Sequence, residues 1–337
     1  MSSLKDVANK AGVAQATVSR VLNGSENVRP KTRRKVEKAI KSLGYTRNRA
    51  AKRLATKKGK TQMMGLLVPD IQNPFYVEVV RGVEEYALDN DYTVLICNFA
   101  QDEKRAKLYL DIMRSEGIDG LIAAPVEEWG KEISDLVHSG LPIVFIDRDL
   151  DGIETDSIVV NNKQGAFEAI EMLLKLGHTR IGFVGGKPQI PTTSERLQGY
   201  ESAIKEAGID KDDSLIKFGD SKNKSGKKLT DELLNLEKPP TALFTGNNLI
   251  TLGALEAINT RGLKIPEDVA IVGFDDMFWS ISLNPPLTAV SQPAYEIGRR
   301  AVEMLLQRID KPNRAPAKVV LNTKLMLRES CGSQARN

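Results

Sequence analysis

The first 44 residues repeat apolar side chains at helical spacing, in two short runs and one longer run. The short runs are Leu4, Val7, Ala8 and Ala11, and then Val18, Val21 and Leu22. Gly12 would end the first helix and a second would follow near 15–23, which predicts a helix-turn-helix. A third helix over 29–44 would pack against both, with Pro30 in its first turn and Thr32 near its cap. The same pattern also occurs in helical bundles that bind no DNA.

From residue 62 onward, short apolar runs alternate with amphipathic segments. The expected strands are 63–69, 93–98, 120–124, 142–146, 157–160, 180–184, a weaker one near 216, 241–245, 269–274 and 319–321. The expected helices are 74–90, 102–116, 127–139, 164–176, 194–207, 226–236, 249–261 and 295–308, and in the first of these Val77, Val80, Val83 and Ala87 should face inward. This alternation predicts an α/β body of two lobes, each a doubly wound parallel sheet built from right-handed βαβ units.

Charge separates the two regions. Residues 1–60 hold 17 Lys and Arg against 3 Asp and Glu, whereas the remainder holds 31 against 41, so the net charge of +4 combines a basic head with an acidic body. A protein that neutralises phosphates needs such an excess, because each Lys or Arg contact releases counterions. We therefore expect double-stranded DNA as a partner. Gln15, Ala16, Thr17, Ser19 and Arg20, at the exposed start of the second helix, would meet base edges and phosphates.

The domain limits follow from these patterns. We expect a helix-turn-helix DNA-binding domain at 1–47, a hinge helix and linker at 48–60, and a disordered tail at 331–337. The first lobe would combine 61–160 with 291–321, and the second 161–290 with 322–330. The three crossings between lobes would form a second hinge, near 160, 290 and 322.

Composition argues against several functional classes. No apolar run approaches the roughly 20 residues of a membrane span, and the first residues lack the apolar core of a signal peptide, so we expect a cytoplasmic protein with no membrane role. The cysteines Cys97 and Cys331 are expected as free thiols, and with two histidines they make a structural metal improbable. Hydrolase and nucleotide motifs are absent, and Gly185-Gly186 lacks the spaced glycines of a dinucleotide site. We expect no enzyme activity and no cofactor.

Polar residues follow several of the expected strands. They are Asp70 and Asn73, Asp147 and Arg148, Asn247 and Asn248, and Asp275 and Asp276. Each alone is more often a cap or turn residue, but open parallel sheets bind ligands where their strands end. Their recurrence predicts a small-molecule cleft between the lobes.

Several local motifs are specific. In the head they are Asp6-Val-Ala-x-x-Ala-Gly-Val, Thr17-Val-Ser-Arg-Val-Leu-Asn and Asn48-Arg-Ala-Ala-Lys-Arg-Leu-Ala; in the body, Val68-Pro-Asp-Ile-x-Asn-Pro-Phe-Tyr, Ser194-Glu-Arg-Leu-Gln-Gly-Tyr and Gly273-Phe-Asp-Asp. Over nearly the whole chain this sequence resembles the LacI/GalR family of bacterial transcription regulators, with the general look of its catabolite-control branch. The resemblance implies a periplasmic-binding-protein-like body behind the DNA-binding head.

The resemblance also implies partners and roles. A homodimer would bind a pseudo-palindromic operator, with Gln15, Ala16 and Arg20 reading bases and Leu54 wedged into the minor groove. The implied DNA contacts also include Thr17, Ser19, Asn23 and Asn48. A sugar or sugar derivative would be the effector, bound by Asn73, Phe75, Asp147, Arg148, Thr192, Arg196, Ser221, Asn247, Asp275 and Gln292. Arg196 and Asp275 would hold ligand hydroxyls, or pair with each other when no ligand is bound.

The sequence departs from the family pattern at four positions. Ala14 stands where serine is usual before the second helix, Ser221 where several relatives place an aromatic ring, and Asn161 and Asn248 where acids are common. Together with the neighbouring lysines Lys187, Lys222 and Lys224, these changes favour a smaller or anionic ligand.

Three functional classes fit a two-lobed body: a ligand-gated DNA-binding regulator, most simply a repressor; a solute-binding protein; and an enzyme working in the cleft. The basic head and the lack of a catalytic constellation favour the regulator. Within that class, a corepressor protein on the body is the alternative to a small ligand.

Overall fold

The structure is a computed structural model that describes residues 2–22, 25, 27–45, 60–126 and 129–333. Its internal contacts divide the chain into two units, Met1–Thr61 and Gln62–Asn337, which we describe separately. Asn23, Asn48 and Leu54, together with most of the expected hinge, lie outside the described residues.

The first unit contains three helices in its described part, α1 (Leu4–Ala11), α2 (Gln15–Leu22) and α3 (Pro30–Leu43). Ser3 and Asp6 form a capping box at the start of α1, and Gly12 ends it in the left-handed region at φ 67°, where glycine carries no steric penalty. At the start of α3 the cap residue is Arg29, with no side-chain hydrogen bond, so Thr32 does not cap this helix. The helices pack through Val7, Val18 and Val36, which are fully buried. The predicted helix-turn-helix is confirmed.

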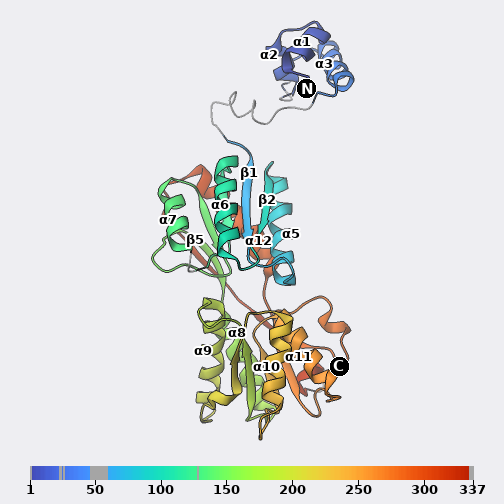
Figure 1. Cartoon of the computed structure of the whole chain (residues 1–337). Coiled ribbons are helices and arrows are strands. Elements are labelled where there is room, and N and C mark those ends of the chain that lie inside the picture. The colour runs from blue at the N-terminus through green and yellow to red at the C-terminus, as the bar shows by residue number, and fades with distance from the viewer. Residues whose placement is uncertain (1, 23–24, 26, 46–59, 127–128, 334–337) are drawn as a thin grey trace. The chain divides into compact units, whose positions relative to one another are not determined.

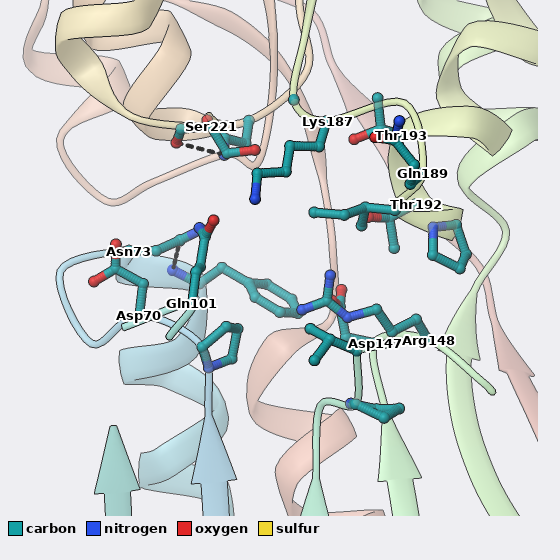
Figure 2. A pocket seen from close by; sticks show the side chains of 18 of the residues that line it. Asp70, Asn73, Gln101, Asp147, Arg148, Lys187, Gln189, Thr192, Thr193 and Ser221 are labelled. Atoms are coloured by element: carbon teal, nitrogen blue, oxygen red, sulfur yellow. Dashed lines mark hydrogen bonds and ion pairs between the residues drawn. The ribbon is translucent and has the colours of Figure 1, made fainter. Parts of the chain in front are cut away.

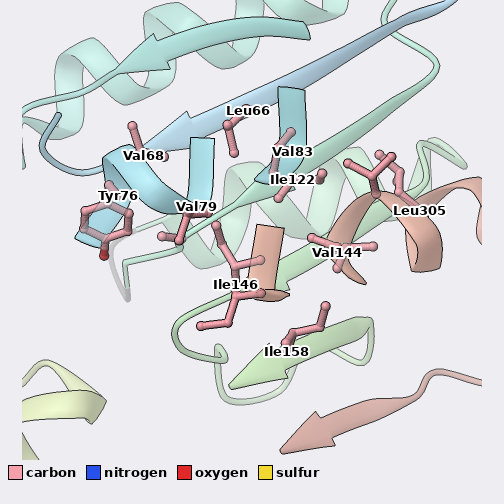
Figure 3. Packing of buried hydrophobic residues seen from close by; sticks show 14 of the residues in the cluster. Leu66, Val68, Tyr76, Val79, Val83, Ile122, Val144, Ile146, Ile158 and Leu305 are labelled. Carbon is pink, nitrogen blue, oxygen red and sulfur yellow. The ribbon is translucent and has the colours of Figure 1, made fainter. Parts of the chain in front are cut away.

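The first lobe of the second unit is built on a six-stranded parallel sheet of order β11-β5-β4-β3-β1-β2 (Figure 1). Its strands are β1 (Met63–Val68), β2 (Thr93–Asn98), β3 (Gly120–Ala123), β4 (Ile143–Ile146), β5 (Asp156–Val160) and β11 (Lys318–Leu321). One face packs against α5 (Pro74–Asp89) and α12 (Ala294–Asp310), with aliphatic side chains from the strands meeting those of the helices (Figure 3). The other face packs against α6 (Glu103–Glu116) and α7 (Gly130–His138).

The inward face of α5 differs from the prediction. Val77 is 51% exposed, whereas Phe75 and Tyr76 are buried. A Cβ atom at Gly82 would lie 2.1 Å from the carbonyl oxygen of Tyr295 on α12, so this glycine allows the two helices to approach closely. That contact rotates Val77 outward, and a pattern of valines alone does not reveal it.

The second lobe has a six-stranded sheet of order β12-β10-β9-β8-β6-β7. Its strands are β6 (Ile181–Gly185), β7 (Ile216–Phe218), β8 (Ala242–Thr245), β9 (Ala270–Phe274), β10 (Thr288–Ser291) and β12 (Lys324–Met326). The helices α8 (Asn162–Lys175) and α9 (Pro191–Glu206) pack on one face, and α10 (Asn223–Leu234) and α11 (Asn248–Thr260) on the other. The sequence did not predict β10 or β12, which are short and pair antiparallel at the edge of the sheet.

The chain changes sheet after Val160, again after Ser291 and again after Leu321. These crossings lie beside the expected lobe limits, which remain a prediction. The tail expected from residue 331 is wrong at its first residue, because Cys331 is fully buried in the second-lobe core. The preceding Ser330 hydroxyl donates to the Ile271 carbonyl at 2.7 Å and accepts from the Thr288 N–H at 2.8 Å, so this polar segment is buried with its hydrogen bonds made. No helix in the described parts of the chain is long and apolar enough to cross a membrane.

Candidate functional site

A cavity of about 460 Å³ lies between the two lobes where their strands end (Figure 2). It falls within the range of small-molecule sites, roughly 300–1,000 Å³. All ten residues predicted to bind an effector line it: Asn73, Phe75, Asp147, Arg148, Thr192, Arg196, Ser221, Asn247, Asp275 and Gln292. The structure therefore brings together residues from seven separate stretches of the sequence.

Two aspartates reach the cavity from equivalent places in the two lobes. Asp147 follows β4 and Asp275 follows β9, and both have left-handed backbones, with φ 70° and 76°. Each donates its backbone N–H to the neighbouring strand, Asp147 to Ile158 O at 3.0 Å and Asp275 to Val290 O at 2.9 Å. A non-glycine residue is uncommon in this conformation, and such residues cluster at ligand sites. The sharp turn directs a buried carboxylate into the cavity from either side.

Tyr76 is a cavity residue that the sequence analysis missed. Its hydroxyl donates to Asp147 Oδ2 at 2.9 Å. Burial, followed by the charge of Asp147, raises the pKa of Tyr76 well above its ordinary value of 10.0, so the hydroxyl remains a proton donor. Tyr76 stands beside Phe75 in the quoted motif, and its ring meets the Phe75 ring edge-on at 5.0 Å. The position of Tyr76 next to Phe75 in the motif is the feature of the sequence that could have identified it as a cavity residue.

Arg196 is held by the second lobe. Its Nε donates to Asn162 Oδ1 at 2.9 Å, its Nη1 to Gly246 O at 2.5 Å, and its guanidinium stacks 3.7 Å from the Phe274 ring centroid. Arg196 and Asp275, the pair that the sequence offers as an alternative to ligand contacts, form no ion pair in the described part of the chain. Asp275 instead accepts from Gln292 Nε2 at 2.5 Å and from the Asn248 N–H at 3.3 Å. Burial raises the pKa of Asp275, and the nearby charge of Arg196 opposes that shift.

Two asparagines line the cavity, and a third, Asn248, is hydrogen-bonded to one of them. Asn73 and Asn247 cap α5 and α11, accepting from Phe75 N–H at 2.8 Å and Ile250 N–H at 2.8 Å. Asn248 donates Nδ2 to Asn73 Oδ1 at 2.8 Å, a hydrogen bond that joins the lobes directly. The departure from an acid at Asn248 therefore has a structural reason, since a carboxylate there would face the oxygen of Asn73 without a proton to donate.

Ser221 occupies the place where relatives were expected to carry a ring. Its backbone is left-handed at φ 65°, and a Cβ atom added at Gly186 would lie 2.1 Å from its Oγ. Ser221 therefore packs against the Gly185-Gly186 turn, and its carbonyl accepts from Asn247 Nδ2 at 3.1 Å. The lining also contains Gln101, Lys187 and Gln189, which were not predicted as site residues.

The DNA-binding candidates lie on α2 of the first unit. Gln15, Ala16 and Arg20 are exposed, and Thr17 and Ser19 are partly buried. The Ala14 carbonyl accepts from Thr17 N–H at 2.9 Å and Val18 N–H at 3.2 Å, so Ala14 occupies the cap position of α2 without a side-chain acceptor. No group of three or more His, Cys, Asp or Glu that could hold a metal is found among the described residues.

Comparison with known proteins gives a consistent result. The profile of "Bacterial regulatory proteins, lacI family" matches residues 3–48, and that of "Periplasmic binding protein-like domain" matches 170–331. Catabolite control protein A of Priestia megaterium is 35% identical over 97% of this chain and 98% of its own length. The structure of a transcriptional regulator CelR–cellobiose complex is 32% identical, with a TM-score of 0.74 and coverage of 98% and 100%. The Lac repressor dimer bound to operator and the anti-inducer ONPF is 28% identical, with a TM-score of 0.85 and coverage of 98% and 99%.

These relatives are transcription regulators and not enzymes, and they match the head and the body of this chain in the same order. The chain therefore belongs to the LacI family, as a transcriptional repressor with a DNA-binding head and a ligand-binding body.

Proposed function

We propose that the protein is a ligand-gated repressor that binds a pseudo-palindromic operator as a homodimer, with a sugar or sugar derivative as effector. The observation that carries this proposal is the cavity between the lobes, which buries Asp147 and Asp275 on opposite sides. Carboxylates of this kind accept hydrogen bonds from hydroxyl groups, which suits a polyhydroxylated ligand. The ten lining residues named above are the proposed effector contacts.

Gating follows from the cavity being shared. A ligand that contacts both lobes binds one arrangement of them more tightly than another, and it shifts the equilibrium by that difference. The Asn248–Asn73 hydrogen bond is one contact that lobe opening would break. We propose that this change reaches the operator through the segment that joins body and head.

The proposed homodimer accounts for exposed apolar side chains on the body. Phe278 is 89% exposed and Ile281 67% exposed, and Val77 and Ile96 are also exposed. The Lac repressor structure is a dimer on its operator, which supports the same assembly here. Sedimentation analysis of a Phe278→Ser, Ile281→Ser double variant should show monomers at concentrations where the parent is dimeric. Unchanged association would place the interface elsewhere.

The operator is tested by selecting sites from random DNA with the full chain and measuring affinity against salt. We expect a two-fold symmetric consensus, and an affinity that falls about a thousandfold between 50 and 200 mM salt if roughly six or more phosphates are neutralised. A flat salt response, or selection of no symmetric site, would contradict the proposal. Since the site is chromosomal, we propose that the protein works in the cytoplasm.

The alternative is control by a corepressor protein that binds the body. Substitutions in the cavity distinguish the two mechanisms. If an Asp275→Asn variant that still binds operator responds to the cellular signal like the parent, the signal enters through a partner on the body instead.

A further inference from the structure

Lys187 is the one cavity-lining lysine, and it has no ionic partner among the described residues. It follows the Gly185-Gly186 turn at the end of β6, and its side chain extends into the cavity with the ammonium group toward the middle (Figure 2). The two other cations of the lining already have partners. Arg148 Nε lies 3.7 Å from Asp147 Oδ2, and Arg196 donates hydrogen bonds to Asn162 and Gly246 of the second lobe. Lys187 is thus an exposed lysine at the cavity wall whose positive charge no described carboxylate pairs with.

The wall beside Lys187 offers further donors. Helix α9 is 16 residues long and begins at Pro191, and its cap residue Ile190 supplies no side-chain acceptor for the first-turn N–H groups. Thr192, in that first turn, is 7% exposed, lines the cavity and has no hydrogen-bond partner for its hydroxyl among the described residues. Pro191 has no N–H, and the Thr193 and Ser194 N–H groups donate to the Ile190 carbonyl at 2.9 and 3.1 Å, so the Thr192 N–H and the partial positive charge of the helix start are what this turn offers an anion.

The lining holds six acids against three cations, but none of these acids forms an ion pair with Lys187 among the described residues. Asp147 accepts from Tyr76, Asp275 from Gln292, and Asp149 pairs with Lys318. The remaining lining acids, Asp70, Glu103 and Asp151, belong to the first lobe, opposite the Lys187 turn. Lys187 and the start of α9 therefore offer donors that no described carboxylate pairs with, while the Asp147 and Asp275 carboxylates enter the cavity from either lobe.

We propose that the effector carries an anionic group, a phosphate ester or a carboxylate, which binds Lys187, the Thr192 hydroxyl and the first turn of α9. This inference rests on the proposed function and names the ligand class of the same cavity: a sugar acid or a sugar phosphate. The polyol part of the ligand points toward Asp147 and Asp275.

The test is isothermal titration of the full chain with matched sets of probes: glucose, gluconate and glucose 6-phosphate; ribose and ribose 5-phosphate; galactose and galactonate; and inorganic phosphate. At least one anionic member should bind, about 10- to 100-fold more tightly than its neutral parent, since hydrogen bonds to charged groups carry this increment. The carboxylate and phosphate members separate the two sources of the anion. If no anionic member binds, or if neutral sugars bind as tightly, the inference is overturned.

Substitutions test whether the tighter binding of the anionic ligand depends on Lys187 and Thr192. Lys187→Gln should weaken the anionic ligand about 10- to 100-fold with little change for the neutral parent sugar, and Thr192→Val should weaken the anionic ligand roughly 3- to 10-fold. Lys222→Gln is the matched control, because Lys222 is an exposed lysine of a nearby loop that does not line the cavity. Equal affinities for Lys187→Gln and Lys222→Gln would refute the assignment.

Failure of the proposed function is measured separately. An operator titration of the same proteins reports gating, so an anion that binds through Lys187 without changing operator affinity would preserve this inference and overturn the gating. The converse result is a neutral sugar that releases the operator equally from the parent and from the Lys187→Gln variant. That result would preserve the gating and overturn this inference.

Discussion

Replacing Arg196 with alanine should destabilise the second lobe and not merely remove a ligand contact. Arg148 provides the control, since both arginines are 6% exposed and line the same cavity. Each lies near a buried aspartate, so Arg196→Ala and Arg148→Ala each remove one positive charge from comparable surroundings. The comparison therefore isolates what Arg196 does beyond its charge.

The difference follows from the contacts. Arg196→Ala leaves Asn162 Oδ1 and Gly246 O without their donor, at about 1–3 kcal/mol for each buried acceptor. It also removes the stacking on Phe274, which is worth about 1–2 kcal/mol when desolvated. The Arg148 side chain makes no hydrogen bond with the described residues, and its Nε is unsatisfied. Allowing for water that enters the space, we expect Arg196→Ala to lose about 3 kcal/mol more than Arg148→Ala.

Urea unfolding of the full-length variants, followed by circular dichroism, measures this difference. With an m-value of about 3 kcal/mol/M, Arg196→Ala should unfold at a midpoint roughly 1 M below that of Arg148→Ala. Equal midpoints, or a lower midpoint for Arg148→Ala, would refute the reasoning. Effector binding by the Arg196 variant is interpretable only under conditions where it is folded.

Four further predictions concern other sites. Ala14→Ser should stabilise the head by about 0.5–1 kcal/mol by supplying the missing cap of α2, measured by calorimetry of the full chain. Arg20→Ala should weaken a selected operator more than random DNA in binding titrations, whereas equal losses would assign it to the backbone. Leu54→Ala should reduce operator bending in a gel-phasing assay, and an unchanged bend would make it a packing residue. Burial raises the pKa of Tyr200 from 10.0 to about 12, so stability of about 2–3 kcal/mol present below pH 10 should be lost as pH rises toward 12. In denaturant titrations Tyr200→Phe should decline less steeply than the parent, and an identical decline would contradict this.

The elements that follow from local pattern were predictable. Helices α1 to α3 and most strands of the two sheets were expected within a few residues, because apolar period and glycine or proline signals act over short stretches. The cavity lining was also within reach, since parallel strands all end at the same edge of a sheet and carry their following residues there. Motif resemblance then selected the ten lining residues among the many polar residues of the body.

What the sequence left undecided concerns contacts between distant positions. Asn73 and Asn248 are 175 positions apart and meet only because the two lobes meet. The approach of α12 to Gly82 turns Val77 outward, and the hydrogen bonds of Ser330 allow Cys331 into the core. Arg196 shows the same dependence, because its role in stability comes from Asn162, Gly246 and Phe274 on three separate elements. Side-chain period reports which face of an element is apolar, but the partner of a buried polar group is set by how the elements pack, and that packing exists only in the folded chain.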